Sequence, residues 1–155
     1  MDSYDRHILE LMQADATLSV GDLAERVALS KTACWRRVQK LEKQGVIRSR
    51  VTLLEPTSVE LGLTVYVVVR TNQHNDAWAR RFGEVIAEIP EVLEAYRMSG
   101  DLDYLLKAVV SDMHGYDRLY KKLILADLFD VSSSFVMETL KHTTALPLDQ
   151  LGVKA

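Results

Sequence analysis

Residues 29–45 read "LSKTACWRRVQKLEKQG", a segment with recognisable signals for both ends of a helix. Ser30 can cap the N-terminus, and Gly45 stands where a left-handed residue commonly ends a helix, so the pattern predicts a helix over residues 31–44. Cys34, Val38 and Leu41 follow the spacing i, i+4, i+7, which places them on one buried stripe. The opposite face is then polar or cationic and contains no carboxylate: Thr32, Arg36, Gln39, Lys40 and Lys43.

The distribution of charge also singles out this segment. The whole chain has a formal net charge of −3, but residues 31–50 contain seven lysines and arginines and a single glutamate. That stretch therefore carries +6, and the remainder carries −9. Such asymmetry predicts a local anion-binding surface attached to an acidic body.

Cys34, the only cysteine, lies among these cations and allows two interpretations. A reactive thiol needs exposure as well as neighbouring positive charge, whereas a buried thiol behaves as a small hydrophobe. The helical register favours burial. Trp35, at the flank of the helix, can either cover the helix bundle or lie against the backbone of a bound nucleic acid.

Two further helices are predicted before this one. Ser3 can cap a helix ending near Ala14, and Ser19, with Asp22 three residues later, can cap a second over residues 20–29. The short connections make the second and third helices a helix-turn-helix, whose second helix enters the major groove of DNA. Residues 46–56, "VIRSRVTLLEP", alternate and predict a strand or two-stranded wing. The predicted DNA-binding residues are Ser30, Lys31, Thr32, Trp35, Arg36, Gln39, Lys40, Lys43, Arg48 and Arg50.

The pattern changes after residue 62. Strands are predicted over residues 63–70, 92–99, 104–110 and 131–141, and helices over 76–89 and 112–126. The order β-α-β-β-α-β is that of the ferredoxin-like motif. The predicted fold is therefore α+β: a winged helix-turn-helix domain over residues 1–54, a linker over 55–62, and a ferredoxin-like βαββαβ sandwich over 63–155.

The chain resembles the Lrp/AsnC, or feast/famine, transcriptional regulators over nearly its whole length. The resemblance runs from "DRHILELMQADATLS" through "LAERVALSKTACWRRVQKLEKQGVI" to "PEVLEAYRMSGDLDYLLKAVVSDMHGYDRLY" and "SSSFVMETLKHTTALPL". It implies a protein that binds double-stranded DNA, senses an amino acid, and forms homodimers that assemble into higher homo-oligomers. One departure is Ala28, in the turn where relatives often carry glycine; in a left-handed conformation alanine costs on the order of 1 kcal/mol.

A second candidate site is "GDLDY", residues 100–104. Aspartate and glycine favour turns, so the residues themselves allow a purely structural turn. The resemblance implies instead that this loop helps to form an effector site between subunits, with Asp101 or Asp103 receiving an ammonium group. The implied effector-binding residues are Gly100, Asp101 and Asp103, with Ser132 and Ser134 added on the expectation that the last strand lies nearby. The amino-acid sequence around this loop is similar to that of regulators of cysteine catabolism.

Other classes of function find little support. The four histidines are far apart with no metal-ligand spacing, and there is no nucleophile motif or Gly-rich phosphate loop. We therefore expect no enzyme activity, no metal and no cofactor. The absence of a long apolar run or a signal-like N-terminus predicts a cytoplasmic protein without membrane association. The alternatives are an effector-independent, nucleoid-like DNA organiser and a ferredoxin-like small-molecule enzyme.

Overall fold

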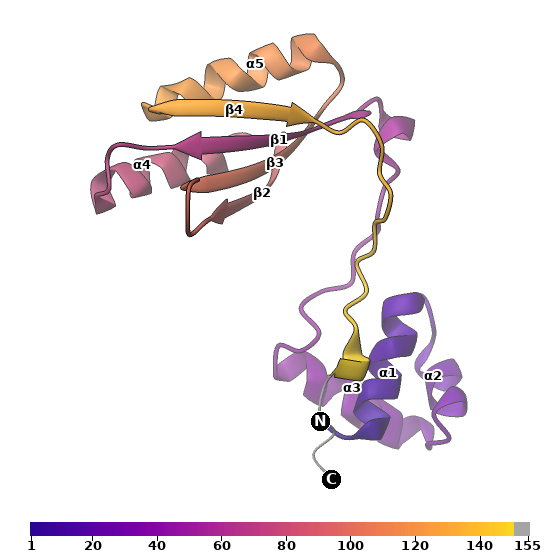
Figure 1. Ribbon diagram of the computed structural model, residues 1–155. Coiled ribbons are helices and arrows are strands. Elements are labelled where there is room, and N and C mark those ends of the chain that lie inside the picture. The colour runs from indigo at the N-terminus through magenta and orange to yellow at the C-terminus, as the bar shows by residue number, and fades with distance from the viewer. Residues whose placement is uncertain (151–155) are drawn as a thin grey trace. The chain divides into compact units, whose positions relative to one another are not determined.

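The computed structural model describes residues 1–150 and divides into two compact units (Figure 1). The first unit contains Met1–Thr52 together with the described residues from Lys141 onward, and the second contains Leu53–Leu140. The sequence-based division placed residues 141–155 in the second domain, whereas the described residues from Lys141 onward belong to the helical unit. Residues 151–155 lie outside the described part of the chain.

The first unit is built from three helices: α1 (Ser3–Ala14), α2 (Val20–Arg26) and α3 (Lys31–Lys43). Each contributes apolar side chains to one shared core. Cys34, Val38 and Leu41 of α3 are at most 2% exposed, which confirms the predicted buried stripe. They pack with five further buried side chains: Ile8, Leu9, Leu23, Ala24 and Val27.

The helix caps follow the sequence with one exception. Ser19 and Asp22 form the predicted capping box, and the Ser30 side chain accepts a hydrogen bond from the Ala33 amide at 3.2 Å. The prediction that Ser3 caps α1 is wrong, since Asp2 is the cap and forms a capping box with Asp5. A carboxylate three residues after Asp2 satisfies the cap's own amide, and this reciprocal bond places the helix start at residue 3.

The end of the described chain returns to the helical unit. Gln13 of α1 forms two hydrogen bonds with the backbone of Leu146, one donated at 3.2 Å and one accepted at 2.7 Å. Leu148, in the short 3-10 turn η3 (Leu148–Gln150), packs against the helical core. Few residues in this tail are apolar, so periodicity gives no sign of the packing.

The second unit is an α+β sandwich. After a 3-10 turn η1 (Pro56–Val59), its elements are β1 (Leu63–Arg70), α4 (Asp76–Ala87), β2 (Val92–Arg97), β3 (Tyr104–Val110), α5 (Met113–Leu123), the 3-10 turn η2 (Ile124–Ala126) and β4 (Asp130–Phe135). The strands form one antiparallel sheet in the order β2-β3-β1-β4. This is the predicted ferredoxin-like order of elements.

Both helices cover the same face of the sheet (Figure 1). Trp78 and Phe82 of α4, and Leu119 and Leu123 of α5, are at most 5% exposed and pack on the alternating buried residues of β1 and β3. The other face carries Tyr66, Glu94, Tyr96 and Lys107, among other residues, and neither helix of this unit covers it. Tyr66 and Tyr96 are 38% and 49% exposed. The sandwich therefore has one closed face and one open face.

The wing strand predicted over residues 46–56 is wrong for this chain, because none of these residues forms a strand. Val51, Leu53 and Leu54 are all more than 60% exposed. An alternating segment becomes a strand only when a second strand supplies hydrogen-bond partners. The described residues place no such strand beside it.

Candidate DNA-binding surface and effector loop

The outward face of α3 is positioned by the packing of its inner face. Because Cys34, Val38 and Leu41 are held in the core, the residues half a turn away point to solvent. The exposed residues include Lys31, Thr32, Trp35, Arg36, Gln39, Lys40 and Lys43. Burial also raises the pKa of the Cys34 thiol, so it stays protonated and serves as packing.

The basic residues of α3 line an open hollow of about 630 Å³, bordered by Trp35, Arg36, Gln39, Lys40, Lys43 and Gln44. We call this the α3 groove. A smaller hollow of about 470 Å³ continues from it and is lined by Asp2, Ala33, Arg36, Arg37 and Lys40. Within residues 1–150, Arg36, Lys40 and Lys43 form no ion pair. These three charges are available to an anionic partner.

The expectation that no carboxylate touches this face needs one correction. Glu42 accepts a hydrogen bond from Gln39 Nε2 at 2.8 Å and forms an ion pair with Arg50 at 2.6 Å. Glu42 therefore orients Gln39 and neutralises Arg50, which was expected on a wing. Arg48 lies in the same non-strand segment, is exposed, and forms no ion pair among the described residues.

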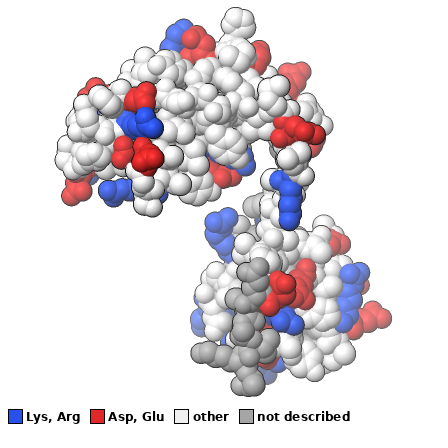
Figure 2. Space-filling view, in the orientation of Figure 1, with Lys and Arg blue, Asp and Glu red and all other residues white. Residues whose placement is uncertain are grey.

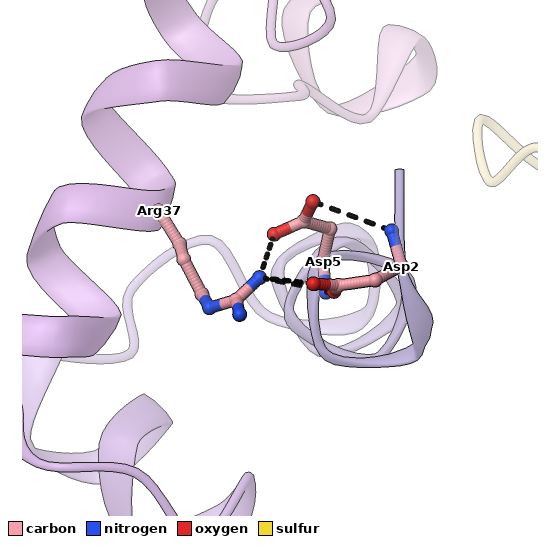
Figure 3. Close-up of polar contacts among 3 residues, drawn as sticks. All are labelled: Asp2, Asp5 and Arg37. Carbon is pink, nitrogen blue, oxygen red and sulfur yellow. Dashed lines mark hydrogen bonds and ion pairs between the residues drawn. The ribbon is translucent and has the colours of Figure 1, made fainter. Parts of the chain in front are cut away.

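Arg37 is also a cation of α3, but it turns away from the groove toward the start of α1 (Figure 3). Its Nη1 lies 2.7 Å from both Asp2 Oδ2 and Asp5 Oδ1, and its guanidinium lies over the Tyr4 ring, 5.3 Å from the centroid. The Asp5 side chain is only 4% exposed. The Asp5 amide and the Arg37 guanidinium hold the pKa of the Asp2 carboxyl below its ordinary value, and both carboxylates raise the pKa of Arg37. This cluster fastens α3 to α1.

The turn before α3 has a left-handed residue that is not glycine. Ala28 has φ +53°, which confirms the conformation considered for this position. Its amide donates to the Glu25 carbonyl and the Leu29 amide to the Ala24 carbonyl, the paired bonds of a Schellman motif. Gly45, with φ +71°, ends α3 in the same way. The C-terminal ends of α2 and α3 are thus closed by the same backbone geometry.

Charges of both signs are scattered over the second unit in the face that Figure 2 shows. The candidate effector loop of this unit, residues 100–104, connects β2 to β3 and is hydrogen-bonded to the end of β1. Asp103 accepts a hydrogen bond from the Thr71 amide at 2.8 Å, and the Asp101 carbonyl accepts one from Arg70 Nε at 3.0 Å. Gly100 has φ +108°, where a side chain would be strained. The Asp101 carboxylate is exposed and forms no ion pair or hydrogen bond within residues 1–150.

Ser132 and Ser134 lie on β4 and not in the loop itself. They project from β4 onto the open face, opposite Val68 and Tyr66. The part of β4 that does meet the loop region is its start, where Asp130 lies 3.4 Å from Arg70. Ser134 is four residues further along, about 13 Å at the usual rise per residue. The structure thus groups Gly100, Asp101 and Asp103 in one loop and places both serines on β4, with Ser134 the further of the two from the end of β4 that meets the loop region.

Two family models match the chain. One is described as the Lrp/AsnC ligand binding domain and matches residues 64–146, and the other as a winged helix-turn-helix DNA-binding domain and matches residues 1–48. The chain is 49% identical to the glutamate uptake regulatory protein of Zymomonas mobilis, over all of this chain and 95% of that protein. It is 46% identical to the DNA-binding transcriptional activator DecR of Escherichia coli, over 96% of this chain and 99% of that one.

Solved structures agree with these matches. An AsnC family transcriptional regulator from Agrobacterium tumefaciens is 55% identical, with a TM-score of 0.92 over 96% of this chain and 98% of that one. A transcriptional regulator from Neisseria meningitidis, solved as a complex with L-Met, is 36% identical, with a TM-score of 0.90 over 96% and 97% of the two chains. No helix within residues 1–150 has the length and apolar character that a bilayer crossing requires.

Proposed function

The chain belongs to the Lrp/AsnC family of transcriptional regulators, and we propose that it binds operator DNA through the α3 groove and responds to an amino acid held at the 100–104 loop. The observation that carries the DNA-binding proposal is the set of unpaired cations around the groove. Arg36, Lys40 and Lys43 surround an exposed surface on the second helix of a helix-turn-helix. In such motifs the second helix lies in the major groove.

The roles of the individual residues follow from their places on α3. Ser30, Lys31 and Thr32 lie at the start of the helix, where free backbone amides and small hydroxyls suit phosphate oxygens. Trp35, Arg36 and Gln39 lie further along the groove, where side chains can reach base edges. Lys40, Lys43 and Arg48 supply phosphate contacts. Arg50 joins them only by leaving Glu42.

For the effector we propose a free amino acid. The relative solved with L-Met supports this class of ligand, and Asp101 offers an exposed carboxylate for its ammonium group. Asp103 keeps the loop in place through the Thr71 amide, so its contribution is to position Asp101 and the loop amides. Ser132 and Ser134 would join the site from β4, either of the same subunit or of a second one.

We further propose that the chain acts as a homodimer that assembles into larger homo-oligomers. The open sheet face and the exposed apolar residues Val51, Leu53, Leu54, Met137 and Leu140 supply the surface for such contacts. Two α3 helices in a dimer would meet successive major grooves about 34–36 Å apart, so the operator is a degenerate palindrome. The effector changes this assembly only if it binds one arrangement more tightly than another.

DNA binding is tested by the salt dependence of affinity for a duplex selected by the full chain from a random pool. Removing a side chain that binds one phosphate reduces the slope of log K against log salt by about 0.9. Arg36→Ala and Lys43→Ala should each weaken binding and flatten the slope. Arg80→Ala, which removes an exposed cation of α4, is the matched control and should change neither. An unchanged slope in both α3 variants contradicts the proposed surface.

Effector binding is tested by a thermal-shift screen of the twenty amino acids. A ligand at 100 times its dissociation constant stabilises the protein by about 2.7 kcal/mol. Asp101→Asn should abolish the shift, and Asp103→Ala should weaken it, because the loop is then no longer anchored on Thr71. If no amino acid shifts the melting temperature of the wild type, the effector proposal fails and an effector-independent DNA organiser remains.

A further inference from the structure

Trp35 is an exposed aromatic side chain that lies outside the apolar core of the helical unit. It is 46% exposed, whereas the other tryptophan, Trp78, is 5% exposed. Trp35 does not belong to the apolar cluster of the helical unit. Within residues 1–150 its ring contacts no other aromatic ring, and its indole N–H has no hydrogen-bond acceptor. Of the two interpretations of this residue, covering the helix bundle is therefore not supported.

The position of Trp35 on α3 places the ring where bound DNA would lie. Trp35 lines the α3 groove beside Arg36 and Gln39, in the first half of the helix. The N-terminal residues of the second helix of a helix-turn-helix contact base edges. The indole is the only aromatic ring among the residues that line this groove. An apolar ring at such a place has few apolar partners on DNA.

The chemistry of the major groove indicates which group of the DNA the Trp35 ring can contact. Phosphates and most base edges present polar atoms to a helix in the major groove, whereas thymine presents an apolar 5-methyl group there. Burying apolar area against that methyl is favourable, and no other base in unmodified DNA offers it. We infer that Trp35 packs against the 5-methyl group of a thymine in each half-site and so helps to determine which sequence the protein selects. This inference rests on the proposed DNA binding and concerns specificity rather than affinity for phosphates.

The neighbouring Gln39 provides the matched control. It lies one turn further along α3, lines the same groove, and is held by Glu42 through one Nε2 hydrogen. Its second Nε2 hydrogen and its carbonyl oxygen can form hydrogen bonds with a base but make no specific contact with a methyl group. Removing Gln39 should therefore change base preference without changing the response to a thymine methyl.

The experiment uses the full chain and a duplex that it selects from a random pool, with each thymine replaced in turn by deoxyuridine, which lacks only the 5-methyl group. For the wild type, one thymine in each half-site should be sensitive, with affinity falling about fourfold per replacement. Trp35→Ala should bind the thymine and uracil duplexes equally. Trp35→Phe, which keeps a ring, should retain part of the discrimination, and Gln39→Ala should retain all of it.

The outcomes separate the two proposals. If Trp35→Ala weakens every duplex equally while the wild type shows no sensitive thymine, the ring contacts the sugar-phosphate backbone and the inference is wrong. It is also wrong if Trp35→Ala, with the circular dichroism spectrum of the wild type, still discriminates thymine from uracil. If the wild type selects no sequence and its binding lacks salt dependence, the proposed DNA binding itself fails and the inference fails with it.

Discussion

The left-handed turn at Ala28 supports a prediction with an internal control, because Gly45 occupies the equivalent position at the end of α3. Each residue directly follows the C-cap residue of its helix, and both lie in Schellman motifs, with φ +53° and +71°. Ala28 is exposed, so its methyl group packs on little. A Cβ at Gly45 would meet no atom within 4 Å. Substitutions at the two sites therefore change backbone preference and almost nothing else.

The magnitude follows from two opposing effects. A left-handed conformation costs a residue with a Cβ about 1–2 kcal/mol. Glycine avoids this cost but increases the conformational entropy of the unfolded chain, which lowers the free energy of unfolding by about 0.4–1 kcal/mol. Ala28→Gly should therefore stabilise the helical unit by about 0.5–1 kcal/mol, and Gly45→Ala should destabilise it by a similar amount.

The assay is urea unfolding of the helical unit, followed by Trp35 fluorescence in a Trp78→Phe background common to all variants. The two single variants should shift the midpoint in opposite directions. The double variant should return close to the starting value, because the two sites lie in separate turns and share no partner. A lower midpoint for Ala28→Gly would mean that the α2–α3 turn tolerates alanine for a reason other than backbone conformation.

Two further perturbations follow from the ion pairs. Arg37→Met should cost about 2–4 kcal/mol by leaving the buried Asp5 carboxylate unpaired, whereas Asp2→Asn should cost less than about 1 kcal/mol because Asp2 is half exposed; urea unfolding of the helical unit measures both. In the second unit, the hydrogen bond from Lys122 holds the pKa of Glu91 below its ordinary value of 4.5. The stability that this pair contributes should be complete above about pH 4.5 and lost as the pH falls through the lower folded-state pKa, so the stability difference between wild type and Glu91→Gln should narrow in acid. An unchanged difference would show that the pair contributes nothing through its charge.

The elements that the sequence predicted best are those with a strong internal pattern. Strands β1 and β3 match their predicted bounds to the residue, because each is a short, mostly apolar run bounded by polar residues. The register of α3 placed Cys34 inside correctly, since its spacing with Val38 and Leu41 leaves one apolar arc. Local signals decide such features, and they are present in the sequence itself.

The features that the sequence missed depend on partners distant along the chain. The pairing of Arg37 with Asp2 and Asp5 joins residues more than thirty positions apart, and no local pattern marks it. The prediction of a wing strand was wrong for the same reason, because the alternating pattern of residues 46–56 does not provide a second strand to pair with. The start of α1 could have been read correctly, because Asp2 and Asp5 have capping-box spacing.

The ion pairs that the sequence missed also set a limit on the proposed DNA interface. Seven cations lie between Lys31 and Arg50, but Arg37 and Arg50 are held by carboxylates of the same unit. The remaining five are Lys31, Arg36, Lys40, Lys43 and Arg48. A dimer using all of them would neutralise about ten phosphates, which corresponds to a log–log salt slope of about −9. A steeper slope would require Arg37 or Arg50 to exchange its carboxylate for a phosphate, or cations outside this segment to take part. Since releasing Arg37 would leave the buried Asp5 without its partner, Arg50, whose partner Glu42 lies at the surface of α3, is the cation that DNA could recruit at lower cost.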